Sequence, residues 1–230
     1  MVLNNQSIPI ITIDGPSSSG KGSISRKLAS ELNWNILDSG ALYRIVAFSA
    51  KLNEIPIEKE SLVKNLISKL KIRFKLLDTF EQKIFLNDCD ITSEIRTEIC
   101  GQNASRIAKY PTVRDQLVGL QRGFLKKPGL IADGRDMGNV VFPASKLKIY
   151  LTADQNERAK RRYNELKQKG INVRFAAVLD DLKQRDNQDK ERNIAPLKVS
   201  PDSVLIDSTN LSINEVVSKI LSLSKLRNIF

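Results

Sequence analysis

A loop rich in glycine and serine, GPSSSGKGS at residues 15–23, carries the clearest chemistry in this sequence. It fits the G-x-x-x-x-G-K pattern of a phosphate-binding loop, although its hydroxyl residue comes one place later than in the simplest form. Small residues let consecutive backbone N–H groups surround an anion. A helix that begins just after the loop directs its positive end at the same anion. The loop therefore predicts binding of a nucleoside triphosphate.

Two side chains of the loop have predicted roles of their own. Lys21 adds a full positive charge against the β and γ phosphates, and Ser23 is expected to ligate Mg²⁺. The residues predicted to bind the triphosphate are Gly15, Pro16, Ser17, Ser18, Ser19, Gly20, Lys21, Gly22 and Ser23.

The segments on either side of the loop have the pattern that such a site needs. Residues 8–14 form an apolar run rich in β-branched side chains, and residues 21–32 have helical periodicity. A strand, a glycine-containing loop and a helix thus follow one another. The alternative, a flexible serine-rich turn, does not explain this order of elements.

The rest of the chain alternates apolar strands with helices. Strands are predicted at 129–133, 147–152 and 204–207, and short antiparallel strands at 72–77, 83–87 and 90–92. Helices are predicted at 40–52, 57–70, 93–108, 112–126, 154–169 and 174–187, and a last helix starts at Ser212 with Glu215 completing a capping box. This pattern predicts an α/β fold of the P-loop NTPase type: a doubly wound parallel sheet flanked by helices, with a small antiparallel insertion.

The composition excludes several classes of enzyme. The 230 residues include no histidine, which rules out Ser-His and Cys-His triads and histidine-ligated zinc. Phosphoryl transfer remains, because it needs positioning and charge stabilisation from Lys, Arg and backbone amides. The net charge of +11 leaves three interpretations open: a solvated lysine-rich surface, a nucleic-acid surface, or a cleft that neutralises phosphates.

The sequence also bears on location. No run approaches the roughly 18 apolar residues of a spanning helix, and we expect no secretory signal. Cys89 and Cys100 lie 11 residues apart, without metal or redox spacing. We therefore expect reduced thiols in a cytoplasmic protein.

A series of further motifs resembles those of the bacterial cytidylate kinases. The motifs keep the family's order over roughly residues 8–217, and ADGRDMG at 132–138 is the most specific of them. The matching segments are LDSGALYR at 37–44, NAS at 103–105, VR at 113–114, QR at 121–122, PGLIADGRDMG at 128–138, VVFP at 140–143, RD at 185–186 with Asp189 and Arg192, and LIDST at 205–209.

The resemblance implies transfer of the γ-phosphoryl group of ATP to CMP or dCMP, by a monomer that binds neither nucleic acid nor a membrane. It implies one domain over residues 1–230, with an NMP-binding insertion at about 57–100 and a lid at about 154–172. Two other functions stay open at this stage. One is another small-molecule P-loop kinase, such as an adenylate or uridylate kinase, and the other is a nucleic-acid-binding ATPase.

The resemblance also assigns residues to CMP. Arg44, Arg135 and Arg192, with Ser39, would hold its phosphate, since the planar guanidinium makes paired bonds to phosphate oxygens. Asp136, Arg114 and Ser105 would read cytosine, and Arg185 and Asp189 would bind the ribose. The alternatives are surface ion pairs for the arginines, a helix-capping Asp136, a solvated Arg114, and a plain intrahelical salt bridge between Arg185 and Asp189.

The remaining assignments concern catalysis. Asp133 ends an apolar strand and is the candidate for the Mg²⁺ shell, partly through water, with an ordinary turn aspartate as the alternative. Arg158 and Arg162 would supply cations from the lid, with a solvated basic helix face as the alternative. The chain departs from the family pattern at Ser18, Ser23, Asn139 and Ala144. Ser18 tightens the loop if its position prefers φ > 0, which predicts an altered rate or nucleotide affinity.

Overall fold

The computed structural model describes residues 8–192 and 194–229, which divide into two compact units. The first unit contains the described residues up to Ile10 and Arg26–Asp133. The second contains Ile11–Ser25 and the described residues from Gly134 onward. The helix α1 (Lys21–Leu32) begins in the second unit and ends in the first.

The five strands of the main sheet confirm the predicted parallel α/β fold. Their order is β2-β6-β1-β7-β8, and the registers of β2 with β6, of β1 with β7 and of β7 with β8 are all parallel. The strands are β1 (Ile10–Asp14), β2 (Asn35–Asp38), β6 (Leu130–Gly134), β7 (Leu147–Thr152) and β8 (Val204–Asp207). Strands β1 and β6 are buried along their whole length, as the near-continuous apolar sequence of a parallel sheet predicts.

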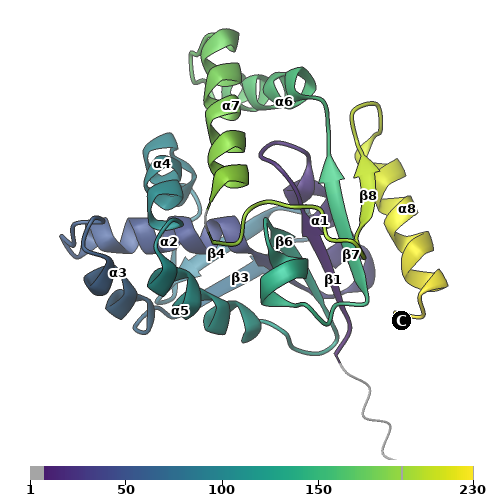
Figure 1. Cartoon of the computed structure of the whole chain (residues 1–230), viewed down its shortest axis with the longest axis horizontal. Helices are drawn as coiled ribbons and strands as arrows, with labels where there is room; N and C mark the ends of the chain where they lie inside the picture. The colour runs from purple at the N-terminus through teal and green to yellow at the C-terminus, as the bar shows by residue number, and fades with distance from the viewer. Residues whose placement is uncertain (1–7, 193, 230) are drawn as a thin grey trace, which may run out of the picture. The chain divides into compact units, whose positions relative to one another are not determined.

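The first unit combines four helices with the predicted antiparallel insertion. Helix α2 packs against α4, and α3 packs against α5 (Figure 1). The helices are α2 (Ser39–Leu52), α3 (Glu60–Ile67), α4 (Glu98–Ile107) and α5 (Pro111–Arg122). The insertion is an antiparallel sheet of β3 (Ile72–Leu76), β4 (Gln82–Leu86) and β5 (Cys89–Asp90).

Three predicted helices of this unit differ from their expected bounds, and one of them, predicted at 112–126, already ends at Arg122. The helix predicted at 57–70 forms only over Glu60–Ile67. The helix predicted at 93–108 is broken into a 3₁₀ turn at Glu94–Arg96 and α4. Thr97 causes the break, since its backbone is extended and its side chain accepts a hydrogen bond from the N–H of Cys100. A threonine in this position starts a new helix instead of continuing the old one.

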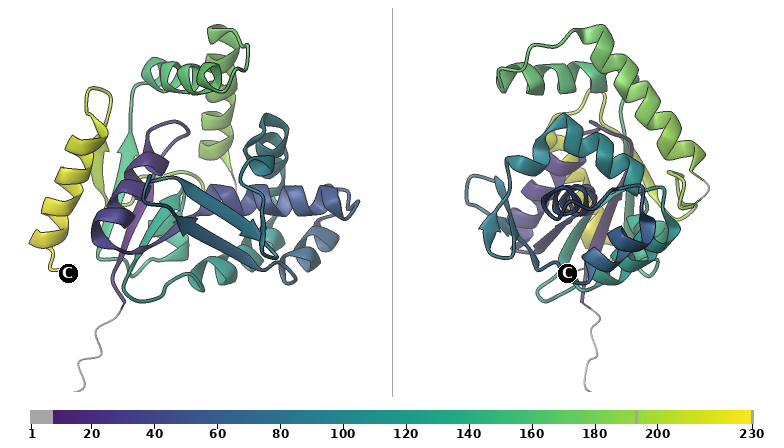
Figure 2. Two further views of the ribbon diagram at one scale, coloured as in Figure 1. Left: turned by 180° about the vertical axis from the view of Figure 1, so that it is seen from behind. Right: turned by 90° about the vertical axis from the view of Figure 1, so that its left-hand side faces the viewer.

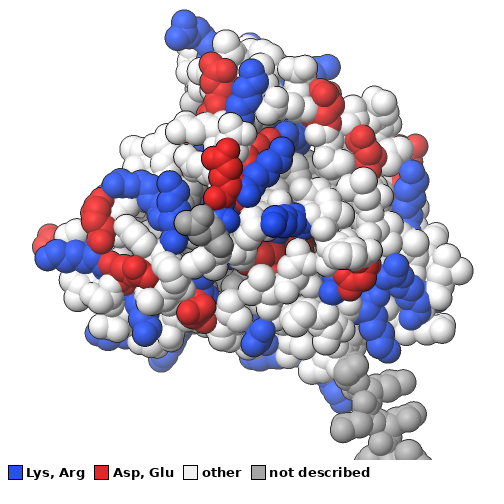
Figure 3. All heavy atoms as spheres, viewed as in Figure 1, with Lys and Arg blue, Asp and Glu red and all other residues white. Residues whose placement is uncertain are grey.

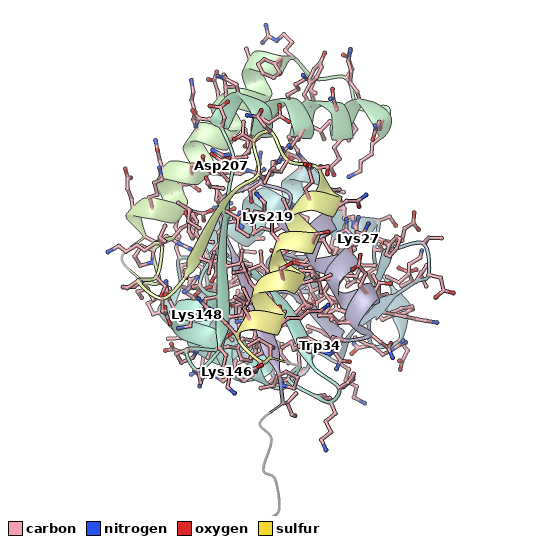
Figure 4. The ribbon with its side chains drawn as sticks, turned by 90° about the vertical axis from the view of Figure 1, so that its right-hand side faces the viewer. Lys27, Trp34, Lys146, Lys148, Asp207 and Lys219 are labelled. Carbon is pink, nitrogen blue, oxygen red and sulfur yellow. The ribbon has the colours of Figure 1, made fainter. Side chains whose placement is uncertain are left out.

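The second unit contains β1, β7 and β8 with three long helices. These are α6 (Gln155–Gln168), α7 (Phe175–Glu191) and α8 (Ile213–Leu226), and the predicted capping box of Ser212 and Glu215 starts the last one. Helices α6 and α7 pack together around Ala159, Leu166, Val178 and Leu182 (Figure 2). Helix α8 lies beside β8, and Lys219 lies on its exposed face (Figure 4).

The connection between β6 and β7 contains one further helical element of the second unit. The segment Met137–Val141 forms a single π-helical turn. Its N-cap residue is Asp136, whose carbonyl accepts from the N–H groups of Val140 and Val141. Single π turns of this kind occur frequently at functional sites.

Candidate functional site

The phosphate loop follows β1 directly and has the backbone that its sequence predicts. Gly15 has φ +153°, and a Cβ there would lie 2.0 Å from the carbonyl oxygen of Leu151 on β7, so only glycine fits. Ser18 has φ +59°, which confirms that its position takes the left-handed conformation that glycine prefers. Lys21 is 6% exposed, and its Nζ donates to the carbonyl oxygen of Pro16 at 2.7 Å. The ammonium group of Lys21 therefore lies against the backbone of the loop that is predicted to bind the triphosphate.

Three arginines of the second unit donate to this loop. Arg135 Nη2 lies 2.7 Å from Ser17 Oγ, and Arg158 Nη1 lies 3.1 Å from the carbonyl oxygen of Ser17. Arg161 Nη1 lies 3.4 Å from the carbonyl oxygen of Ser19. With Lys21, the structure therefore gathers four cationic side chains at the loop, which is the arrangement that a polyphosphate requires.

Arg158 is held by a buried ion pair that joins α6 to α7, the two helices that form a helical hairpin. Its Nη2 and Nη1 donate to the two carboxylate oxygens of Asp186 at 2.6 and 3.1 Å, and both side chains are 6% exposed. Its Nε donates to the carbonyl oxygen of Ala153. The interpretation of Arg158 as part of a solvated basic face is therefore wrong. The same guanidinium links α6, α7 and the phosphate loop.

Arg162 lies farther along α6, among acidic side chains. It pairs with Glu165 at 2.9 Å, and its charge also acts on Asp181 of α7, whose pKa burial raises while Arg162 lowers it. Figure 3 shows the same alternation of basic and acidic side chains over α6 and α7. The structure thus brings Arg158 to the phosphate loop, and it pairs Arg162 with Glu165 on the same helix.

Three residues assigned to CMP meet in the second unit. Arg135 Nε lies 2.6 Å from Asp189 Oδ2, and Arg192 Nη2 lies 3.9 Å from Asp189 Oδ1. Burial acts to raise the pKa of Asp189, but Arg135 and Arg192 lower it below its ordinary value. Arg185, on the same helix, pairs with Asp181 at 2.9 Å. Arg185 and Asp189, the two residues predicted to bind the ribose, therefore pair with other side chains. The salt bridge between these two residues that the alternative supposed is not among these pairs.

Asp136 is buried, and it occupies the N-cap position of the π turn without a capping bond from its side chain. The helix-capping interpretation of Asp136 is therefore wrong. A residue that sequence reasoning missed, Asp14, serves the turn instead. Its Oδ1 accepts from the N–H of Met137 and its Oδ2 from the N–H of Gly138, both at 2.8 Å. A carboxylate at the end of a buried apolar strand, directly before the loop, was the signal available in the sequence.

The buried position of Asp14 makes the stability of the protein depend on pH. Burial raises its pKa to about 6, against the lowering effect of the two backbone bonds. Between about pH 4 and pH 6 the native state holds a proton at Asp14 that the unfolded state has lost. The contribution of Asp14 to the free energy of unfolding should therefore fall by roughly 3 kcal/mol as the pH rises through this window.

Urea unfolding of the native protein and of Asp14→Asn, across pH 4 to 7, measures this contribution. The stability of the variant relative to the native protein should increase with pH. A constant difference across the window would show that burial does not raise the pKa of Asp14.

The first unit holds the remaining residues assigned to CMP, and two of them, Arg44 and Ser105, contact α4 or the residues just before it. Arg44 Nη1 donates to the carbonyl oxygens of Ile95 and Thr97, both at 2.9 Å. A Cβ at Gly101 would lie 2.6 Å from Arg44 Nη2, so this glycine makes room for the guanidinium. Ser105 Oγ donates to the carbonyl oxygen of Gly101 at 3.2 Å. Ser39, the first residue of α2, is buried.

Arg114 is 4% exposed, which contradicts its interpretation as a solvated side chain. Its guanidinium donates to the carbonyl oxygen of Ala108 at 3.2 Å and lies 5.8 Å from the ring centroid of Tyr43. Tyr43 and Arg44 are adjacent on α2. Arg114, Arg44 and Ser105 thus lie on three helices of this unit, α5, α2 and α4.

The donors predicted for Mg²⁺ are a hydroxyl and a carboxylate, the hard oxygen ligands that this ion prefers. Asp133 is buried in β6, in register with Asp38 of β2, and is followed by Gly134. The part of the chain that the structure describes holds no group of three or more acidic, cysteine or histidine side chains suited to a metal.

Two sequence expectations about the whole chain can also be compared with the described residues. None of the described helices is both long and apolar enough to cross a membrane. Cys89 is exposed, Cys100 is buried, and both are free cysteines, as their spacing predicts.

Comparisons with known proteins agree with the family suggested by the motifs. The family model of cytidylate kinase matches residues 11–226. A cytidylate kinase from Colwellia psychrerythraea is 47% identical over 216 residues, covering 94% of this chain and 96% of the relative. One from Pseudomonas aeruginosa is 48% identical over 218 residues, covering 94% and 95%. A solved gluconokinase from Sinorhizobium meliloti superposes with a TM-score of 0.46 at 14% identity, covering 97% of this chain and 96% of that one.

The family match covers the phosphate loop, the insertion and the helix hairpin, and it excludes the nucleic-acid ATPase as the class of this protein. The chain therefore belongs to the cytidylate kinase family, the ATP-dependent phosphotransferases that act on CMP and dCMP.

Proposed function

We propose that this chain moves the γ-phosphoryl group of ATP onto CMP or dCMP by in-line transfer, using the residues that its sequence singles out. The observation that carries the proposal is the position of Arg135. One guanidinium donates to Ser17 in the phosphate loop and to Asp189 on α7. The first residue is assigned to ATP and the second to the acceptor nucleotide, so Arg135 contacts a residue of each set.

The chemistry requires charge stabilisation more than proton transfer. The acceptor is already a phosphate anion, so no strong general base is needed. Charge spreads over the equatorial oxygens in the transition state, and Lys21, Arg135 and Arg158 are the cations placed at the loop. Mg²⁺, when bound, neutralises phosphate charge, and Ser23 and Asp133 are the residues that would hold it, in part through water.

Different residues are proposed to bind the phosphate, the ribose and the base of CMP. Arg44, Arg135 and Arg192, with Ser39, hold the CMP phosphate, and Arg185 and Asp189 hold the ribose. Cytosine offers an amino donor at N4 beside acceptors at N3 and O2. Asp136 accepts from N4, while Arg114 and Ser105 donate to the acceptor side. Uracil presents a carbonyl at position 4, and this would leave the carboxylate of Asp136 without a donor.

The larger elements have proposed roles as well. The insertion at about 57–100 closes over the acceptor, and the lid at about 154–172, with Arg158 and Arg162, closes over ATP. The enzyme works as a cytoplasmic monomer without nucleic acid. The ion pair of Arg158 with Asp186 and the apolar cluster between α6 and α7 support the lid assignment, because they hold the two helices together as one body.

Substitution of Asp136 tests the recognition of the base. Asp136→Ala should lower kcat/KM for CMP and dCMP by about 10- to 100-fold, because the N4 amino group loses its acceptor. The KM for ATP should change less than about 2-fold, since Asp136 is not assigned to ATP. Initial rates with CMP, dCMP, UMP and AMP provide the measurement, and the preference for CMP over UMP should decrease.

Asp180→Ala is a matched control, because it removes an exposed carboxylate from α7 of the same unit. It should leave all four rates unchanged. If Asp136→Ala impairs the use of ATP and of CMP equally, or leaves the preference for CMP over UMP unchanged, Asp136 does not recognise the base.

A further inference from the structure

The carboxylate of Asp14 holds the backbone next to two residues of the proposed acceptor site. It accepts two hydrogen bonds of 2.8 Å, from the N–H groups of Met137 and Gly138. Arg135 and Asp136 immediately precede these two amides in the chain. We propose that Asp14 is a positioning residue for the acceptor nucleotide, fixing the π turn so that Arg135 and Asp136 face CMP. This inference rests on the proposed roles of those two residues.

The start of the turn needs an outside partner. The first N–H groups of a helical turn have no acceptor within the turn itself. In this turn the Asp136 carbonyl accepts from Val140 and Val141, which leaves the amides of Met137 and Gly138 to be satisfied from elsewhere. The side chain of Asp136 does not cap the turn, and Asp14 accepts from both amides instead.

A carboxylate is the group that suits this position. The two N–H groups of the turn each donate to a separate oxygen of Asp14, and an ionised aspartate supplies two acceptor oxygens. An asparagine of the same shape supplies one oxygen and turns an NH₂ group toward the second donor. Asp14 is 6% exposed, and Lys21, Asp136 and Tyr150 are the charged or titratable groups whose fields reach it.

The surroundings of the turn leave it little freedom to adjust. A Cβ at Gly138 would lie 3.0 Å from Thr12 Oγ1 and about 3.1 Å from the side chain of Lys148. The turn is therefore pressed against β1 and β7. Lys148 is itself fixed, since its Nζ lies 2.7 Å from Asp202 Oδ2. A change at Asp14 should move the backbone of the turn, and with it the residues just before it.

Asp14 also immediately precedes Gly15, so the alternative is that it supports only the phosphate loop. The two roles differ in the substrate that they affect. If Asp14 supports only the loop, its replacement should weaken the binding of ATP. If Asp14 supports the turn, its replacement should weaken the binding of CMP. Both oxygens of Asp14 accept from the turn, which favours the second role.

The test compares Asp14→Asn with Thr12→Val at pH 7.5. Thr12 lies two residues earlier on the same face of β1, is buried, and its hydroxyl has no hydrogen-bond partner within the described residues. Asp14→Asn should raise the KM for CMP at least ~10-fold, the scale of one charge-assisted bond, and change the KM for ATP less than ~2-fold. It should also lower the preference for CMP over UMP. Thr12→Val should leave both constants near their native values.

The outcomes separate this inference from the proposed function. The positioning role is wrong if Asp136→Ala raises the KM for CMP but Asp14→Asn does not. It is also wrong if Asp14→Asn raises the KM values for CMP and ATP equally. In both cases the proposed function stands. If Asp136→Ala also leaves the KM for CMP unchanged, the proposed base-reading role of Asp136 is wrong as well.

The native protein gives the answer even if Asp14→Asn fails to fold. The amide resonances of Met137 and Gly138 should shift when CMP saturates the enzyme, and shift less with a non-hydrolysable ATP analogue. Resonances that do not respond to CMP would overturn the proposal.

Discussion

Lys21→Ala is expected to lower kcat for the phosphorylation of CMP by at least ~10²-fold, the scale on which enzymes lose rate when one preorganised charge stabiliser is removed. The γ-phosphoryl group gains charge on its equatorial oxygens as it moves. Lys21 is buried beside the loop, and its ammonium group lies 2.7 Å from the Pro16 carbonyl. A cation in that position is screened little by water, so its loss acts on the transition state at nearly full strength.

Lys27→Ala provides the matched control for this prediction. Lys27 lies on the same helix, α1, but is half-exposed and forms an ordinary i, i+4 pair with Glu31 at 3.9 Å. Such a surface pair contributes little to stability, and kcat should stay close to the native value. Steady-state kinetics with saturating ATP and CMP decide the matter, with circular dichroism to verify folding. A Lys21→Ala enzyme with near-native kcat would remove Lys21 from the catalytic set.

The parts of the fold that could be predicted from sequence are those that short-range chemistry determines. The phosphate loop needs glycine at residue 15 because β7 passes too close for a side chain, and it tolerates Ser18 in a left-handed conformation. The capping box of Ser212 and Glu215 starts α8 as its spacing predicts. The capping box depends on near neighbours in the chain, whereas the glycine of the loop is recognisable from its local motif although the crowding at Gly15 comes from Leu151.

The features that could not be predicted from the sequence depend on partners distant in the chain or on competition between local signals. Thr97 interrupts a helical pattern because its hydroxyl satisfies an amide better as an N-cap than within a helix. The partner of Arg158 is Asp186, 28 residues away, and no periodicity on α6 identifies it. Asp14 and Met137 are 123 residues apart in the chain, so no local sequence pattern relates them, and only the fold brings β1 next to the π turn.

The pair of Arg158 and Asp186 carries the second large prediction. Removal of one partner from a buried ion pair leaves the other charge without compensation, and this costs about 3–5 kcal/mol of the free energy of unfolding. Arg158→Ala and Asp186→Ala should each lose stability on this scale. The double replacement Arg158→Met with Asp186→Leu should stay within ~1 kcal/mol of the native protein, because apolar residues of similar volume often substitute for a buried pair without loss.

This double variant separates the structural role of Arg158 from its catalytic one. Arg158 also donates to the carbonyl oxygen of Ser17, and a methionine cannot replace either that bond or the positive charge at the loop. The double variant should therefore be stable in urea unfolding, yet its kcat should be at least ~10-fold lower. Native kcat in a stable double variant would mean that Arg158 only joins α6 to α7. In that case the loop's remaining cations, Lys21, Arg135 and Arg161, would have to supply the transition-state charge by themselves.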